Sequence, residues 1–272
     1  MGKFDGILIV SDLDGTLLNC EKEISAENRR AIAYFEAEGG HFTYISGRVA
    51  RCLAPILQML TPPIPVGCNN GMVYDPNAGE WVDFTAMSPE VFPLVEDVLE
   101  KCPDAGVVVM GKKHVYFSKR DPIGDRFRKI VGLSERYDGI KDIKEPFCKV
   151  LFAYPEEKFD DLKAVVDGHP LAPSYEIVRS DPQYYEVMPR GCNKGRALAL
   201  IAAHLGVSPK RTIAVGDNEN DITMFQAAEL GIAVANAAPG AKEAADMVLE
   251  VSNQQHAIAE IIARIADGRI VI

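Results

Sequence analysis

The sequence predicts an α/β fold in which a doubly wound, mainly parallel sheet carries a second, inserted α/β domain. Two observations predict this class. At both ends of the chain, short apolar runs alternate with helical patterns, whereas in the middle several strand-like runs follow one another without a helix between them. The length of 272 residues, with 47% hydrophobic and 25% charged, suits one large domain or two ordinary ones.

The apolar runs of the outer parts are typical of strands buried on both faces of a parallel sheet. These runs lie at 7–10, 42–45, 212–215 and 232–234. Ser25 is the expected cap of a first helix that ends near the Gly39-Gly40 pair. Further helices are expected at about 48–60, 193–205, 219–229 and 254–266. Alternating strands and helices predict the doubly wound layer.

The middle of the chain has a different pattern. Helix-like stretches at 89–101, 120–131 and 156–167 lie among strand-like stretches at 106–110, 114–118, 147–154, 174–179 and 184–188. Adjacent strands predict an antiparallel or mixed sheet with helices on one face. We therefore predict that a domain of residues 84–187 is inserted into a core domain of residues 1–83 and 188–272. Two strands around a D-P-N-A-G turn at 75–79 are expected just before it.

Composition excludes several classes of protein. With 39 acidic and 29 basic side chains, the net charge of −10 argues against general binding to nucleic acid or to an anionic membrane. The six cysteines are far apart and form no C-x-x-C pair, which argues against zinc and against a disulfide framework. The apolar run at 7–10 is too short for a signal peptide, and the uncharged stretch at 197–207 is too short to span a bilayer. We expect a soluble, cytoplasmic chain.

The most specific local signal is Asp12-Leu13-Asp14-Gly15-Thr16, which follows the first predicted strand. Ligands of open α/β sheets bind outside the carboxyl ends of the strands, where both aspartates would lie. Aspartate, glycine and threonine are also common in ordinary turns, so the motif alone leaves a turn open.

Two further predicted strands end in polar residues. The run at 42–45 is followed by S-G-R at 46–48, and the run at 212–215 is followed by G-D-N-E-N-D at 216–221. The carboxyl ends of parallel strands meet at one edge of a sheet, so we expect these clusters to form a single site. Several carboxylates at one edge repel each other unless a cation lies among them, and oxygen ligands of this kind suit Mg²⁺.

Phosphate oxygens would suit the same edge. Ser46 and Gly47 offer a hydroxyl and backbone N–H groups, and Lys194 offers an ammonium just before an apolar helix. A cation in the first turn of a helix opposes the macrodipole, so the position of Lys194 needs another reason.

These elements, in this order, resemble the haloacid dehalogenase superfamily of aspartate-nucleophile phosphohydrolases, and more closely its Cof-type, sugar-phosphatase-like branch. The residues that carry the resemblance are D-L-D-G-T-L-L at 12–18, S-G-R at 46–48, N-N-G at 69–71, N-K-G-R-A-L at 193–198, G-D-N-E-N-D-I-T-M-F at 216–225, A-V-A-N-A at 233–237 and K-E-A-A-D at 242–246. The resemblance covers both ends of the chain and implies a Rossmann-like core sheet. The middle matches in length and pattern as a large, type IIB-like cap.

The resemblance implies a magnesium-dependent phosphatase for small phosphate monoesters, with sugar phosphates as the first expectation. Asp12 would attack phosphorus and form an aspartyl-phosphate, while Asp14 would protonate the leaving group and then activate water. The metal residues it implies are Asp12, Asp217, Asp14 through its backbone carbonyl, and Asp221 either behind the ligands or through a water. The phosphate-binding residues it implies are Ser46, Gly47, Lys194 and Asn220.

Other features leave alternatives open. Seven basic side chains at 112–129 could present cations to an anionic substrate or form a solvated surface. Glu186 could face a substrate, and Asn69 and Asn70 could line the site or form a turn. Arg48 could cap the site or begin its helix in a surface ion pair.

Two other functions are compatible with these motifs. A phosphosugar mutase shares D-x-D-G-T and a similar cap, and it would need a cap that excludes water and binds a second phosphate. A sensing protein would keep the site and bind a phosphometabolite without turnover. In each case the expected partner is a small phosphorylated metabolite, not a nucleic acid or a membrane. The sequence leaves the oligomeric state and the substrate open.

Overall fold

The structure is a computed structural model that describes residues 2–118, 121–131 and 142–272. The chain divides into two compact units, of which the first comprises Met1–Asp83 and Asn193–Ile272 and the second comprises Phe84–Cys192. The second unit ends later than the predicted 187, because its strand β10 (Tyr184–Pro189) continues in the sheet of that unit.

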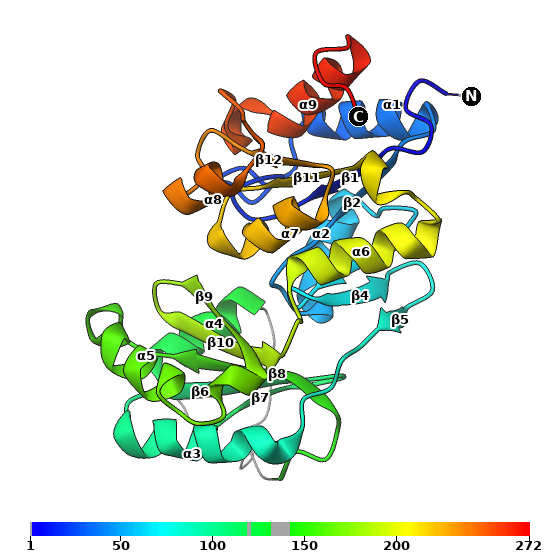
Figure 1. The fold of residues 1–272 in the computed structure, drawn as a ribbon. Coiled ribbons are helices and arrows are strands. Elements are labelled where there is room, and N and C mark those ends of the chain that lie inside the picture. Colours follow the sequence, from blue (N-terminus) through cyan, green and yellow to red (C-terminus); the bar gives the residue numbers. More distant parts are fainter. Residues whose placement is uncertain (1, 119–120, 132–141) are drawn as a thin grey trace. The chain divides into compact units, whose positions relative to one another are not determined.

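The first unit is built on a parallel sheet with the strand order β13-β12-β11-β1-β2 (Figure 1). Its strands are β1 (Leu8–Ser11), β2 (His41–Tyr44), β11 (Thr212–Gly216), β12 (Leu230–Ala233) and β13 (Met247–Val248). From β1 the chain first moves outward to β2, and after β11 it moves outward in the other direction to β13. The boundary between β1 and β11 is therefore the switch point of a doubly wound sheet, where ligands bind. The predicted fold class is confirmed.

Helices cover both faces of this sheet. On one face, α1 (Ala26–Ala37) packs on α9 (Ala257–Ala266), and on the other α6 (Lys194–Leu205) packs on α7 (Ile222–Ala227) (Figure 1). Ser25 caps α1 as predicted, because its Oγ accepts a hydrogen bond from the backbone N–H of Asn28 at 3.2 Å. Two short helices, α2 (Ala54–Met59) and α8 (Pro239–Ala244), complete this unit's described α-helices, and α8 was not predicted.

After β2 and α2, the chain forms a small antiparallel sheet. It contains β3 (Val66–Cys68), β4 (Met72–Asp75) and β5 (Glu80–Asp83), and the last two form the predicted pair of strands around the D-P-N-A-G turn. Arg196 at the start of α6 donates hydrogen bonds to both oxygens of Asp83 and to the carbonyl of Gly71. These bonds tie the small sheet to the helix that begins at Lys194.

The second unit contains an antiparallel sheet with the order β7-β6-β8-β10-β9. Its other strands are β6 (Gly106–Gly111), β7 (Val115–Phe117), β8 (Phe147–Ala153) and β9 (Tyr175–Asp181). The helices α3 (Phe92–Lys101) and α5 (Phe159–Asp167) pack against each other and contribute Leu94, Val98, Leu162 and Val166 to an apolar core with one face of this sheet.

The third helix of this unit, α4 (Pro122–Val131), lies on the other face. Successive side chains of a strand point to opposite faces of a sheet. Tyr185 contacts Phe159 of α5, whereas its neighbour Tyr184 contacts Phe127 of α4. The expectation of helices on one face is therefore correct for α3 and α5 and wrong for α4.

Two findings bear on the cellular setting. Within the described ranges, no helix is long and apolar enough to cross a membrane. All six cysteines are free thiols; Cys20 is exposed and the other five are buried. The five buried thiols serve as small apolar side chains.

Candidate active site

Asp12 lies directly beyond β1, at the carboxyl edge of the parallel sheet. Its backbone N–H donates to the carbonyl of Val215 at 2.8 Å, which extends the parallel ladder by one residue. The buried side chains of Leu13 and Leu17 anchor the loop that follows, and the Leu17 N–H returns to the Asp12 carbonyl at 3.2 Å. The carboxylate is thereby held at the switch point with only 9% of its side chain exposed.

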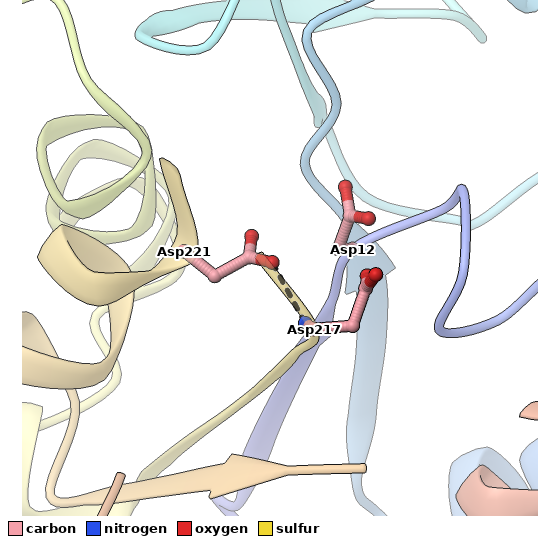
Figure 2. A group of neighbouring side chains, drawn as sticks. All are labelled: Asp12, Asp217 and Asp221. Atoms are coloured by element: carbon pink, nitrogen blue, oxygen red, sulfur yellow. Dashed lines mark hydrogen bonds between the residues drawn. The ribbon is translucent and has the colours of Figure 1, made fainter. Parts of the chain in front are cut away.

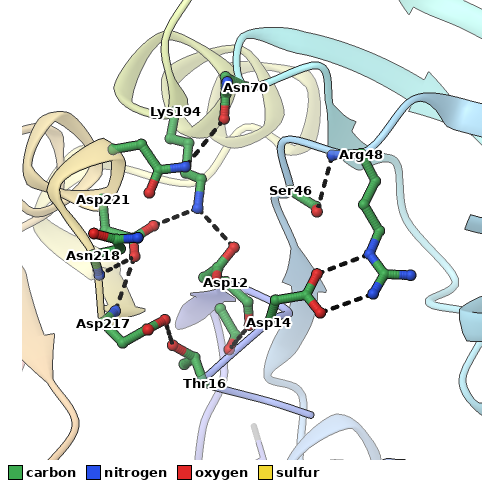
Figure 3. A network of polar contacts seen from close by, with 12 residues as sticks. Asp12, Asp14, Thr16, Ser46, Arg48, Asn70, Lys194, Asp217, Asn218 and Asp221 are labelled. Carbon is green, nitrogen blue, oxygen red and sulfur yellow. Dashed lines mark hydrogen bonds and ion pairs between the residues drawn. The ribbon is translucent and has the colours of Figure 1, made fainter. Parts of the chain in front are cut away.

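Lys194 supplies a buried ammonium next to this carboxylate. Its Nζ donates to Asp12 Oδ1 at 2.6 Å and to Asp221 Oδ1 at 2.5 Å, and its side chain is 1% exposed (Figure 3). Burial by itself lowers the pKa of Lys194, but the two carboxylates outweigh it and raise the pKa. This pairing is the reason for a cation in the first turn of α6, where the macrodipole opposes it.

Asp221 holds the lysine and the preceding loop in place. Its Oδ2 accepts hydrogen bonds from the backbone N–H groups of Asp217 at 2.8 Å and Asn218 at 3.0 Å, while its Oδ1 binds Lys194. A side chain at Gly216 would collide with it, because a Cβ there would lie 2.4 Å from Asp221 Cγ. Because both of its oxygens accept hydrogen bonds, Asp221 fixes the positions of the Lys194 ammonium and of the loop that carries Asp217.

Asp217 is held in turn by the D-x-D-G-T loop. Thr16 Oγ1 donates to Asp217 Oδ1 at 2.8 Å. Gly15 has a φ of +85°, and a Cβ at this residue would lie 2.4 Å from Asp217 Oδ2. Thr16 belongs to the D-x-D-G-T motif, but the motif alone indicates no role for it. The glycine and the threonine of the motif are needed to bring two distant aspartates together.

Three carboxylates meet at this edge. Asp12, Asp217 and Asp221 each offer an oxygen within 4.8 Å of the others (Figure 2). Burial raises the pKa of Asp12 well above its usual value, and the charges of Asp221 and Asp217 add to this against the opposing charge of Lys194. Burial and the charge of Asp221 likewise raise the pKa of Asp217 to about 6. One ammonium does not balance three carboxylates, so an all-oxygen donor set with excess negative charge fits Mg²⁺.

The side chain of Asp14 is directed elsewhere. Arg48 binds it with two parallel hydrogen bonds, from Nε to Oδ2 and from Nη2 to Oδ1, each of 2.8 Å, and Lys22 Nζ also reaches Oδ1 at 2.8 Å (Figure 3). Burial raises the pKa of Asp14, but the hydrogen bonds and charges of Arg48 and Lys22 outweigh it and lower the pKa. Arg48 therefore pairs with a predicted site residue. A metal contact of Asp14 would fall to its backbone carbonyl, as the resemblance implies.

Ser46 is buried beside this pair. Its backbone N–H donates to the carbonyl of Gly67 at 3.1 Å, which holds the residue against strand β3. Its Oγ accepts a hydrogen bond from the N–H of Arg48 at 3.2 Å, which leaves the hydroxyl proton for an anion. A Cβ at Gly47 would lie 3.2 Å from Asn70 Oδ1, so the loop of residues 46–48 passes close to Asn70.

Asn69 and Asn70 form a turn beside the loop that carries Ser46. Both are buried and lie in the left-handed region, with φ of +48° and +62°, which asparagine tolerates better than most side chains. The Asn70 N–H donates to the carbonyl of Ser46 at 3.1 Å, and its Oδ1 accepts from Asn220 Nδ2 at 3.3 Å. Asn220 thus contacts Asn70. The turn is observed for both asparagines, and their lining of the site stays a prediction.

Two other candidates lie in the second unit. Glu186 is buried in β10 and bonded to Lys149 Nζ at 2.7 Å and to Ser180 Oγ at 2.9 Å. Of the basic side chains at 112–129, residues 119 and 120 lie outside the described residues. Arg126 donates a hydrogen bond to Gln183, and Arg128 forms an ion pair with Asp125. Both partners belong to the second unit itself. We assign none of these to the site of the first unit.

The carboxylate cluster lies at the switch point of a doubly wound sheet, which is where such folds bind their ligands. The profile of the haloacid dehalogenase-like hydrolases matches residues 9–262. The chain belongs to this family and is a phosphatase.

Individual relatives agree with this assignment. "Putative phosphatase YxeH" of Bacillus subtilis (strain 168) is 31% identical, with 94% of this chain and 96% of the relative covered. The 5-amino-6-(5-phospho-D-ribitylamino)uracil phosphatase YwtE of the same organism is 26% identical over 96% of this chain and 98% of its own. The solved structure of the subclass IIB sugar phosphatase BT4131 has a TM-score of 0.82 at 21% identity, with 97% of this chain and 100% of that chain covered, and this likeness concerns the fold.

Proposed function

We propose that this phosphatase hydrolyses small phosphate monoesters with Mg²⁺, through an aspartyl-phosphate on Asp12. Sugar phosphates are the substrate class that we propose. The observation that carries the proposal is the buried Lys194 ammonium, 2.6 Å from Asp12 Oδ1, beside three carboxylates with oxygens within 4.8 Å. The relative YwtE is named for a phosphorylated ribityl compound, which supports a phosphorylated polyol or sugar as substrate.

The metal would be held by Asp12, by Asp217 and by the backbone carbonyl of Asp14. Asp221 would contact these ligands without touching the metal, or would bind the metal through a water. When bound, Mg²⁺ supplies positive charge to the phosphoryl oxygens. Lys194 and the hydroxyl of Ser46 bind the same oxygens, and Gly47 and Asn220 complete this binding surface. Phosphoryl transfer depends mainly on positioning and electrostatic stabilisation, which these groups provide.

The covalent steps then use two aspartates. Asp12 Oδ1 is bound by Lys194, so Oδ2 is the nucleophile that forms a bond to phosphorus while the bond from phosphorus to the ester oxygen breaks. Asp14, once it carries a proton, transfers that proton to the ester oxygen, and the alcohol leaves. A water then attacks phosphorus and gives a proton to Asp14, which releases inorganic phosphate and restores the Asp12 carboxylate.

We infer that the second unit, Phe84–Cys192, acts as a cap that selects the substrate, because the roles proposed for the first unit concern the phosphoryl group and assign no residue to the rest of the substrate. We also place the enzyme in the cytoplasm, where the free thiol state of its six cysteines would be maintained. Its expected partner is a small phosphorylated metabolite.

A screen of phosphorylated metabolites with Mg²⁺, read as released phosphate, tests this function. Asp12→Asn should abolish turnover and leave the thermal unfolding temperature within a few degrees of the wild type or above it. Magnesium-dependent turnover by Asp12→Asn would refute the covalent mechanism. Isomerised sugar phosphate in place of free phosphate would indicate a mutase, and thermal stabilisation by a metabolite without turnover would indicate a sensor.

A further inference from the structure

Arg48 and Asp14 form the best-defined ion pair of the site outside the Lys194 cluster. The guanidinium makes two parallel hydrogen bonds of 2.8 Å, one to each carboxylate oxygen, with side chains that are 25% and 38% exposed. A planar guanidinium matches a carboxylate in this way and fixes its direction, whereas a single ammonium binds as a point charge. The carboxylate plane of Asp14 is therefore set by Arg48.

The position of Arg48 is itself set by the loop that carries Ser46. The Arg48 N–H donates to Ser46 Oγ at 3.2 Å, and the Arg48 carbonyl accepts from the N–H of Asn69 at 2.9 Å. The same loop thus delivers a hydroxyl for the phosphoryl group and a guanidinium for Asp14. This arrangement fixes the distance between the group that binds phosphate and the group that exchanges a proton.

The contacts of Asp14 leave room for that exchange. An ionised carboxylate offers about four acceptor positions. Within the described part of the chain, Arg48 takes one position on each oxygen and Lys22 takes a second on Oδ1. The remaining position on Oδ2 can take up a proton, which is received from water or passed to the ester oxygen.

We propose that Arg48 is the positioning residue of Asp14 and that its guanidinium holds the carboxylate in the direction needed to exchange a proton with the leaving group. This inference rests on the proposed function, in which Asp14 protonates the ester oxygen. Loss of Arg48 would then affect substrates in proportion to how much their leaving group needs that proton.

Phenyl phosphate and p-nitrophenyl phosphate provide the test, because phenolate is the more basic leaving group. The value of kcat/KM reports the steps up to departure of the leaving group and is independent of later hydrolysis. Arg48→Gln should lower kcat/KM for phenyl phosphate by about tenfold or more, within the contribution of a general acid, and for p-nitrophenyl phosphate by about threefold or less. Arg48→Lys should resemble Arg48→Gln, because lysine cannot make the paired bonds.

A double-mutant cycle separates positioning from general structural damage. Asp14→Asn with Arg48→Gln should be no slower on phenyl phosphate than Asp14→Asn alone, because the two residues act as a unit. Arg30→Gln removes an exposed arginine that pairs with Glu27 in α1, and it should leave kcat/KM for both substrates unchanged. Thermal unfolding of every variant establishes that it is folded.

Three results would overturn the inference while leaving the phosphatase function intact. These are equal losses on both substrates, losses that multiply in the double variant, and faster turnover of phenyl phosphate by Arg48→Gln. The first would make Arg48 a substrate-binding or structural residue, and the last would make it a restraint on Asp14. Failure of the wild type to release phosphate from either ester, or turnover by Asp12→Asn, would overturn the proposed function and this inference with it.

Discussion

Asp217→Asn is expected to stabilise the metal-free protein and to remove its response to magnesium. Burial and the charge of Asp221 raise the pKa of Asp217 from 3.8 to about 6 in the folded state. Ionised Asp217 therefore destabilises the fold at neutral pH, and an asparagine of the same shape removes that penalty. Thr16 Oγ1, which donates to Asp217 Oδ1, can donate equally to an amide oxygen.

The size of the effect follows from the two pKa values. The difference between about 6 and 3.8 corresponds to about 3 kcal/mol. Asp217 keeps partial contact with solvent, so we expect about half of this, roughly 1–2 kcal/mol. For a chain of this size, such a gain raises the unfolding temperature by roughly 3–6 °C.

The sign depends on pH. Because the folded-state pKa lies above the unfolded-state value, the wild type loses stability relative to the variant as pH rises through about 6. The advantage of Asp217→Asn should be small near pH 4 and complete by pH 8.

Thermal unfolding in a chelator at several pH values measures this difference. Asp5→Asn is a suitable control, because it removes an exposed aspartate of the same unit. Addition of Mg²⁺ at a hundred times its Kd should then stabilise the wild type by about 2.7 kcal/mol, which raises its unfolding temperature. The same addition should barely change the unfolding temperature of Asp217→Asn. The reasoning fails if the variant is no more stable than the wild type at pH 8, or if both respond equally to magnesium.

Three further substitutions test other parts of the structure. Lys194→Gln should lower kcat by about a hundredfold or more, because it removes a buried charge aimed at the phosphoryl oxygens; unchanged steady-state kinetics would contradict this role. Gly15→Ala should abolish activity and magnesium stabilisation together, since its Cβ would lie 2.4 Å from Asp217 Oδ2 at a φ of +85°; thermal unfolding with and without Mg²⁺ checks this. Lys149→Met should cost about 3 kcal/mol or more, because it removes one partner of a buried ion pair with Glu186; denaturant unfolding measures it, and adding Glu186→Leu should recover most of the loss.

Much of the core unit could be predicted because its signals are local. An apolar run buried on both faces of a sheet needs no polar side chains, so the strands around β1 and β11 are visible as uninterrupted segments. The rule that ligands bind at the carboxyl edge then places Asp12 and Asp217 at one site without coordinates. Lys194 was a candidate because a cation in the first turn of a helix needs a reason, and the family resemblance gave it a role. Its two carboxylate partners supply that reason.

Contacts between loops could not be predicted in this way. Asp14 and Arg48 are 34 residues apart, and their pairing depends on side-chain rotamers and on the path of a loop that no periodicity describes. The hydrogen bond from the backbone N–H of Ser46 to the carbonyl of Gly67 in β3 likewise joins two segments that no periodicity relates. Similarly, the amphipathic pattern of α4 indicates that one side is buried and does not say against which face of a sheet.

The sequence by itself determined the sheet, the edge at which the polar residues gather and the kind of chemistry that their side chains allow. These depend on burial along single segments and on the direction of parallel strands. Only the tertiary structure decided which atoms bind which: that Asp221 faces Lys194 and the Asp217 backbone, and that Asp14 faces Arg48. The physical reason is that a hydrogen bond depends on atomic positions to within a few tenths of an ångström, and distant segments acquire such positions only when they pack.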